Sequence, residues 1–411
     1  MGLAPNQLPQ GLRWLNRAGK LLRSTGFNPP SLCQDVLLRK ASRATGLNDF
    51  GDGLHREGLT HLLDALEQEA ELTTLGRLMA TDSIKEDLIA RLKMVDYRKR
   101  HPEIDKEEVR APIFIVGLPR TGTTLLYNLL SQDPSRRVPL SWEVVYPVPP
   151  PQAESYATDP RIEKTRKRFA QTDTMVPDLH AIHPIDALLP EECSTFTSRE
   201  FQSRNYSYVF DIPSYYDWYV NRSQVDVYEA HRRYLQHLQL YFKKDRWLLK
   251  APQHLPFIGD LFKVYGDAQL IQTHRNPCEV IPSMGSLVYH MRAITRETID
   301  TAAIGQEKLD RWSWALDRAL ATRDAIPEKG KQISDVRFAD LMSDPLGQIE
   351  RLYDHFGWQC DANVTKRMED FMKSNPRDKH GSHRYTLEMF HLTQEEVRQR
   401  FTHYMQRYEL G

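Results

Sequence analysis

Short apolar runs alternate with amphipathic stretches over the second part of the chain. Each run is rich in Ile, Val or Leu and ends at polar or turn-forming residues, which is typical of a buried strand. We expect strands at 111–117 (APIFIVG), 246–250 (RWLLK), 268–275 (AQLIQTHR) and 332–338 (QISDVRF). Because helical patterns separate them, the sequence predicts an α/β fold with a central parallel sheet flanked by helices.

The chain divides by pattern into three parts. Residues 1–110 have helical periodicity and no strand-like run, so we expect a helical N-terminal region. Residues 111–411 contain all the predicted strands and form the α/β domain, with a mostly helical insertion at about 152–245. Eight aromatic residues lie within 201–220 of that insertion, a cluster that lines a ligand pocket or, as is more common for aromatics, forms a core.

Charge is balanced over the whole chain but not along it. The 411 residues include 55 Lys plus Arg and 55 Asp plus Glu, which argues against a general nucleic-acid coat protein. Residues 1–45 nevertheless carry seven cations and one acid, Asp35. Residues 11–23 place Leu12, Leu15 and Leu22 near one helical face. This pattern fits a helix on an anionic membrane, or a surface helix docked on its own protein or on a partner subunit; we favour docking.

No run of residues has the length and hydrophobicity of a membrane-spanning helix, and the N-terminus has no apolar signal-peptide core. The four cysteines (33, 193, 278 and 360) are far apart and have no CxxC spacing. They predict reduced thiols rather than a disulfide framework or a zinc site, and a cytoplasmic protein.

A glycine-containing loop joins the first strand to the next helix. Gly117 and Gly122 are separated by four residues, as in a Walker A loop, and Thr123 and Thr124 begin the helix. Helix N-termini of this kind bind phosphate through free N–H groups. Thr123 stands where a nucleoside-triphosphate loop has Lys, the cation is instead Arg120 within the loop, and no acidic magnesium ligand is evident. We therefore expect an anion site of P-loop type without a metal.

Two segments together resemble the sulfotransferase superfamily. IFIVGLPRTGTTLLYNLL is similar to its 5′-phosphosulfate loop, in the form that carries Arg at position 120. Residues 268–283 resemble its 3′-phosphate motif, a strand ending in Arg275 with Ser283 eight residues later. The resemblance covers about residues 111–390 and implies a three-layer P-loop-type fold.

The resemblance implies transfer of a sulfuryl group from 3′-phosphoadenosine 5′-phosphosulfate to an alcohol, phenol or amine. It assigns the 5′-phosphate to Arg120, Thr121, Gly122, Thr123 and Thr124, the 3′-phosphate to Arg275 and Ser283, and the sulfuryl group to Lys250. Arg120 would neutralise charge that develops on the leaving nucleotide.

Two residues compete for the role of general base. His254 follows Lys250, but with two more intervening residues than in the cytosolic members of the superfamily. Glu143 lies 23 residues after Arg120, about where relatives with an Arg loop have a catalytic Glu, and we favour Glu143.

Two rival functions remain at this point: a P-loop kinase, and a nucleotide-binding scaffold without catalysis. The aromatics at 201–220 suggest an apolar or aromatic alcohol as the small-molecule acceptor, and the oligomeric state, including a homo-oligomer, is open. Residues 379–386 (KHGSHRYT) resemble a basic loop that closes over the nucleotide.

Overall fold

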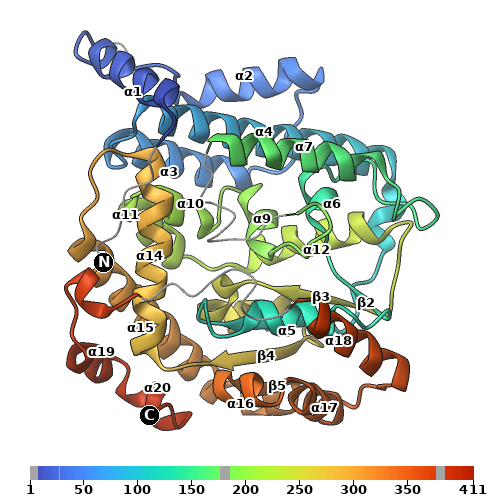
Figure 1. Ribbon diagram of the computed structural model, residues 1–411. Helices are drawn as coiled ribbons and strands as arrows, with labels where there is room; N and C mark the ends of the chain where they lie inside the picture. Colours follow the sequence, from blue (N-terminus) through green and yellow to red (C-terminus); the bar gives the residue numbers. More distant parts are fainter. Residues whose placement is uncertain (1–7, 27, 176–185, 376–384) are drawn as a thin grey trace.

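The computed structural model describes residues 8–26, 28–175, 186–375 and 385–411. Its centre is one parallel sheet with the strand order β2-β3-β1-β4-β5 (Figure 1). The strands are β1 (Ile113–Gly117), β2 (Arg136–Arg137), β3 (Arg246–Lys250), β4 (Gln269–His274) and β5 (Ile333–Arg337). The four strands predicted from apolar runs are therefore confirmed. The two-residue edge strand β2 was missed because two consecutive arginines carry no hydrophobic pattern.

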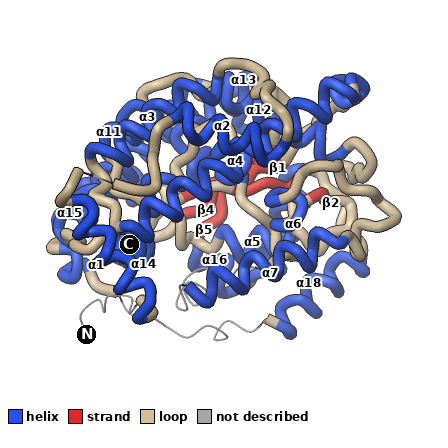
Figure 2. Tube along the Cα trace, turned by 90° about the horizontal axis from the view of Figure 1, so that it is seen from above, coloured by secondary structure: helices blue, strands red, loops and turns tan. Residues whose placement is uncertain are grey.

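Helices cover both faces of the sheet. Successive side chains of β1 point to opposite faces and are apolar on both, so both faces need a covering layer. Ile113 and Ile115 pack on one face, with α5 (Thr123–Leu130), α17 (Pro345–Phe356) and α18 (Ala362–Ser374). Phe114 and Val116 point to the other face, into the main core. That core includes side chains of α12 (Val225–Gln239), α13 (Ile258–Val264), α14 (Pro277–Thr295) and α15 (Thr301–Ala325). In Figure 2 the strands lie enclosed between helices, which confirms the α/β class.

The N-terminal region is helical, as predicted. It consists of α1 (Gln10–Arg23), α2 (Gln34–Thr45), α3 (Leu54–Gln68), α4 (Thr74–Arg100) and the 3-10 turn Pro102–Lys106. Both α1 and α2 pack on α4, α4 packs on α14, and α3 packs on α11 (Pro213–Val220). Leu37 and Leu59 belong to the same core cluster as Phe114 of the sheet. The N-terminal region thus shares one continuous core with the α/β domain.

The insertion is also mainly helical. Its helices are α7 (Pro160–Met175), α9 (Cys193–Ser198), α10 (Asn205–Val209), α11 and α12, preceded by α6 (Ser141–Val145). Six of the eight aromatics at 201–220 are buried in the main core, and Tyr208 and Trp218 are partly buried against it. Most of this aromatic cluster is therefore core rather than pocket lining.

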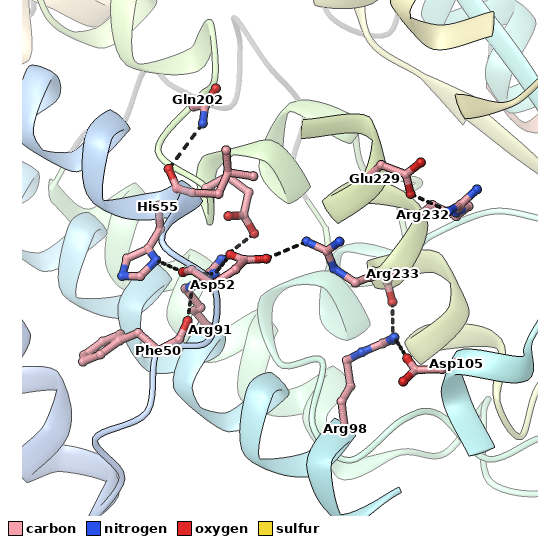
Figure 3. A network of polar contacts seen from close by, with 12 residues as sticks. Phe50, Asp52, His55, Arg91, Arg98, Asp105, Gln202, Glu229, Arg232 and Arg233 are labelled. Carbon is pink, nitrogen blue, oxygen red and sulfur yellow. Dashed lines mark hydrogen bonds and ion pairs between the residues drawn. The ribbon is translucent and has the colours of Figure 1, made fainter. Parts of the chain in front are cut away.

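A polar network fixes the insertion to the N-terminal region (Figure 3). The buried guanidinium of Arg91 donates to the carbonyl of Phe50 at 2.7 Å, to Asp52 at 2.6 Å and to Glu200 at 2.5 Å. Arg233 of α12 reaches the second carboxylate oxygen of Asp52 at 2.9 Å. Since these partners come from three separate parts of the chain, the network orients the insertion over the sheet.

The C-terminal part completes the covering layers with α16 (Phe338–Ser343), α19 (Gln394–Arg400), α20 (Thr402–Arg407) and four-to-six-residue 3-10 turns at 327–332 and 387–390. All four cysteines are free thiols. In the described part of the chain, no helix has the length and apolar character needed to cross a bilayer.

Candidate active site at the carboxyl edge of the sheet

Three neighbouring strands end at the same edge of the sheet, and each brings a cation there. Lys250 ends β3, the loop 118–122 with Arg120 follows β1, and Arg275 follows β4. In open parallel sheets ligands bind outside the carboxyl ends of the strands, where the strand order reverses. Here β1 is that point, because β3 and β4 lie on its two sides.

The loop after β1 has the backbone of an anion site. Gly122 precedes α5 with φ 86°, a left-handed conformation that costs glycine little. Arg120 also has a positive φ, 67°, although it carries a side chain. Such strain in a non-glycine residue is characteristic of functional loops. At the end of this loop α5 begins, and the free N–H groups of its first turn point outward along the helix axis. An anion is favoured at that position.

Buried hydroxyls fix this loop to β4. Thr121 is fully buried, and its Oγ1 donates to the carbonyl of Leu118 and contacts Oγ1 of Thr273, both at 2.6 Å. Gly117 lets the strands approach, since a Cβ on it would lie 2.4 Å from Oγ1 of Thr273. The side chain of Thr121 therefore shapes the loop from within. Of the next two residues, Thr123 is buried and Thr124 is exposed.

Arg275 links the two motifs that the sequence singled out. Its guanidinium donates to the carbonyl of Arg120 at 2.8 Å and to Glu279 at 2.6 Å, and it lies 4.0 Å from the ring centre of Phe338. Partial burial lowers the pKa of Arg120, and the neighbouring charge of Arg275 lowers it further. Arg120 and Arg275 thus bring two cations to one place, and Glu279 offsets the charge of Arg275. Ser283 lies partly buried on α14, two turns into the helix that follows Arg275.

Lys250 has a carboxylate partner that the sequence did not indicate. Its buried ammonium is paired with Glu192, which is partly exposed and directly precedes α9. The neighbouring Glu191 is turned away, toward Ser141 at 3.2 Å and Thr195 at 3.3 Å. The charge of Glu192 also acts on Tyr208. Burial is the main reason that the pKa of Tyr208 is raised to about 12, and the negative charge of Glu192 is a smaller one. The sequence does show two adjacent glutamates, Glu191 and Glu192, but their positions along the chain do not indicate which of them reaches Lys250.

Glu143, expected as the general base, has both carboxylate oxygens bonded within the protein. It is fully buried and forms a two-contact ion pair with Arg137. Its Oε1 also accepts from the backbone N–H of Leu140 and from the hydroxyl of Tyr156, both at 2.8 Å. The side chain caps α6 and neutralises Arg137, and both of its oxygens are occupied.

His254, the other expected base, lies beneath the edge in the core. It is almost fully buried, its Nδ1 contacts the hydroxyl of Tyr228 at 2.9 Å, and it packs edge-on against Phe114. Burial lowers its pKa well below the usual value, and the neighbouring His231 lowers it further. The imidazole is held neutral among aromatic rings, with Nδ1 bonded to Tyr228 and Nε2 without a hydrogen-bond partner among the described residues.

Residues 379–384 of the basic segment expected to close over the nucleotide lie outside the described residues. Within the described ranges, no group of three or more His, Cys, Asp or Glu side chains is arranged to hold a metal ion.

The chain is similar to known sulfotransferases in sequence. A sequence model described as the sulfotransferase family matches residues 112–362, more than half of the chain. Two curated proteins, from Mycobacterium bovis and Mycobacterium tuberculosis, are each named omega-hydroxy-beta-dihydromenaquinone-9 sulfotransferase Stf3. Each is 28% identical over 297 residues, which cover 67% of this chain and 70% of the relative.

Two solved structures are similar over nearly the whole chain. Sulfotransferase STF1 from Mycobacterium tuberculosis superposes with a TM-score of 0.82 at 34% identity, covering 90% of this chain and 98% of that one. Sulfotransferase STF9 from Mycobacterium avium gives 0.86 at 28% identity, with coverages of 94% and 99%. The similarity thus includes the N-terminal helices that carry no recognisable motif.

Proposed function

This chain belongs to the sulfotransferase family, and we propose that it transfers a sulfuryl group from 3′-phosphoadenosine 5′-phosphosulfate to a hydroxyl group on an apolar, lipid-like acceptor. One observation carries the proposal: Arg275 bonds to the carbonyl of Arg120 at 2.8 Å, which joins the two anion-binding motifs at one edge of the sheet. A donor with phosphate groups on both ends of its ribose needs two such sites side by side.

The donor would lie across this edge. The N–H groups at the start of α5, with Thr123 and Thr124, would hold the 5′-phosphate. Arg275 and Ser283 would hold the 3′-phosphate, and Thr121 would keep the loop in shape from below. Arg120 would face the bridging oxygen, where negative charge grows as the sulfuryl group leaves.

We place the general base on Glu192 in place of Glu143 or His254. Glu192 is the partly exposed carboxylate beside Lys250, whereas Glu143 and His254 are buried. The acceptor oxygen would attack sulfur while its proton passes to Glu192. The bond from sulfur to the bridging oxygen then breaks, and adenosine 3′,5′-bisphosphate leaves. Lys250, paired with Glu192 at rest, would contact the sulfuryl oxygens in the transition state.

The names of two relatives support the proposed acceptor class. The two Stf3 proteins are named for a hydroxylated menaquinone, a long apolar molecule with a terminal hydroxyl group. Tyr208 is partly buried against the core; burial is the main cause that raises its pKa and the charge of Glu192 is a smaller one, so an aromatic ring lies within electrostatic reach of the proposed base.

The test measures donor binding and transfer separately. Calorimetry with adenosine 3′,5′-bisphosphate should give at least ~10-fold weaker binding for Arg275→Ala, since a charge-assisted contact is lost. Arg110→Ala is the matched control, because Arg110 is an exposed arginine just before the opposite, amino end of β1. Transfer is then followed by mass spectrometry with hydroxylated quinols and isoprenoid alcohols. Equal binding by both variants, or no sulfated product from any hydroxyl acceptor, would contradict the proposal.

A further inference from the structure

Helix α1 is fixed to the protein through one face only. The amide oxygen of Asn16 accepts from the backbone N–H of Leu75 at 2.9 Å. Gly19 allows close contact, because a Cβ there would lie 1.6 Å from Oγ1 of Thr74. Leu12 packs with Leu75 in a small cluster. These contacts hold the helix on the start of α4, at the outer end of the molecule (Figure 1).

The opposite face of α1 exposes large apolar side chains. Trp14 is 61% exposed, Leu21 is 73% exposed and Leu22 is 44% exposed. At 100° per residue Trp14 and Leu21 lie within about 20° of each other around the helix axis, and Leu22 lies about 80° from Trp14, at the margin of this face. Leu12, Leu15 and Leu22 lie within about 80° of one another, as predicted, but only Leu12 and Leu15 are partly buried, and Leu22 is exposed. We call Trp14, Leu21 and Leu22 the outer face of α1.

Cations flank this outer face. Helix α1 carries Arg13, Arg17, Lys20 and Arg23 and no acidic residue. Lys20 is paired with Glu297 and Arg23 bonds to Thr74, whereas Arg13 and Arg17 are exposed. The guanidinium of Arg17 lies 5.6 Å from the ring centre of Trp14. Apolar and cationic groups are thus side by side on one solvent-facing surface.

We propose that the outer face of α1, with Arg13 and Arg17, docks this protein onto an anionic lipid bilayer. Trp and Leu side chains enter the headgroup region of a membrane, and flanking arginines bind lipid phosphates. Charge complementarity favours a bilayer over a second copy of the chain, which would bring like charges together. Three side chains also offer only a few hundred Å², against about 800 Å² per partner in a stable protein interface.

The docking proposal does not depend on the acceptor assignment. It places the protein at the surface where apolar acceptors reside, through a helix that contributes no residue to the proposed active site. Binding to vesicles and transfer to a water-soluble acceptor are therefore separable measurements, and either can fail alone.

The test uses the full chain and co-sedimentation with vesicles. Vesicles of phosphatidylcholine mixed with phosphatidylglycerol should bind the protein, and pure phosphatidylcholine should bind it more weakly. Trp14→Ser combined with Leu21→Ser should lower the partition coefficient at least ~10-fold, because the burial of two large side chains is lost. Arg13→Gln with Arg17→Gln should lower it roughly fivefold per cation, and only for anionic vesicles.

Leu188→Ser is the matched control, since Leu188 is 43% exposed on a different part of the surface. It should leave vesicle binding unchanged, and all variants should keep the affinity for adenosine 3′,5′-bisphosphate. Equal vesicle binding by the wild type and the Trp14/Leu21 variant would overturn the proposal. A second result would also overturn it: the wild type does not bind anionic vesicles but forms a dimer, and the Trp14/Leu21 variant is a monomer. The outer face of α1 would then bind a second copy of the chain.

Discussion

Arg137 and Glu143 form a buried ion pair with two contacts, so both oxygens of the carboxylate expected as the general base are already bonded to a cation. Arg137 comes from the short edge strand β2, which has no signal in the hydrophobic pattern. The carboxylate that fits the family spacing is consequently used to neutralise a buried cation. Substitutions of Glu143 and Glu192 can therefore separate a role in stability from a role in catalysis.

We expect Glu143→Gln to weaken the fold rather than the chemical step. Removal of one partner of a buried pair leaves the other charge uncompensated, which costs about 3 kcal/mol or more in the free energy of unfolding. Urea denaturation measures that loss, and turnover per folded molecule should stay within a few-fold of the wild type. A variant of unchanged stability with turnover reduced a hundredfold would return Glu143 to the role of base.

Glu192→Gln should affect the chemical step instead. An amide cannot take the acceptor proton, so kcat should fall ~10²-fold or more while the affinity for adenosine 3′,5′-bisphosphate is retained. Glu191→Gln is the neighbouring control, because the Glu191 carboxylate faces Ser141 and Thr195. Comparable kcat values for the two variants would rule out Glu192 as the base.

Gly117→Ala should damage the loop without touching its cations. Gly117 has φ 143°, and a methyl group there would lie 2.4 Å from Oγ1 of Thr273 and 2.7 Å from the Thr273 carbonyl. Overpacking and backbone strain together should cost about 2 kcal/mol or more of stability and weaken bisphosphate binding. Gly330→Ala is the control, since nothing lies within 4 Å of a Cβ there. If the two variants unfold at the same urea concentration, the tight packing of β1 on β4 is not essential.

Stability should rise with pH from neutral to alkaline conditions because of Lys308. This ammonium is buried and bonded to Glu307 at 2.7 Å, and the same carboxylate also holds Arg292 and Arg311. Burial lowers the pKa of Lys308 from 10.5 to about 7, against the attraction of Glu307. Between these two values the unfolded chain binds more protons than the folded one, so raising the pH favours folding.

Lys308→Met isolates this contribution. The difference in unfolding free energy between wild type and variant should change by at most ~1.4 kcal/mol per pH unit across this window. Urea denaturation at several pH values measures it. A difference that does not vary between pH 7 and 10 would show that Lys308 titrates normally in the folded protein.

The parallel sheet and the positions of the two motifs around Arg120 and Arg275 could be predicted from the amino-acid sequence. Strands of Ile, Val and Leu and the spacing of Gly117, Arg120 and Gly122 are local features, and local patterns dictate backbone conformation directly. Arg275 could be placed beside Arg120 because neighbouring parallel strands end at the same edge of a sheet.

Which polar side chains pair with one another, and which faces remain exposed, depended on how distant elements pack. Glu192 meets Lys250 across 58 positions of sequence, and Glu143 pairs with an arginine on a strand that the hydrophobic pattern did not indicate. Periodicity likewise made α1 amphipathic but did not say that Asn16 and Gly19 would face the protein while Trp14 and Leu21 faced outward. Such pairings depend on how distant elements pack, because burial of a side chain is a property of its neighbours in space and not of its neighbours in the chain.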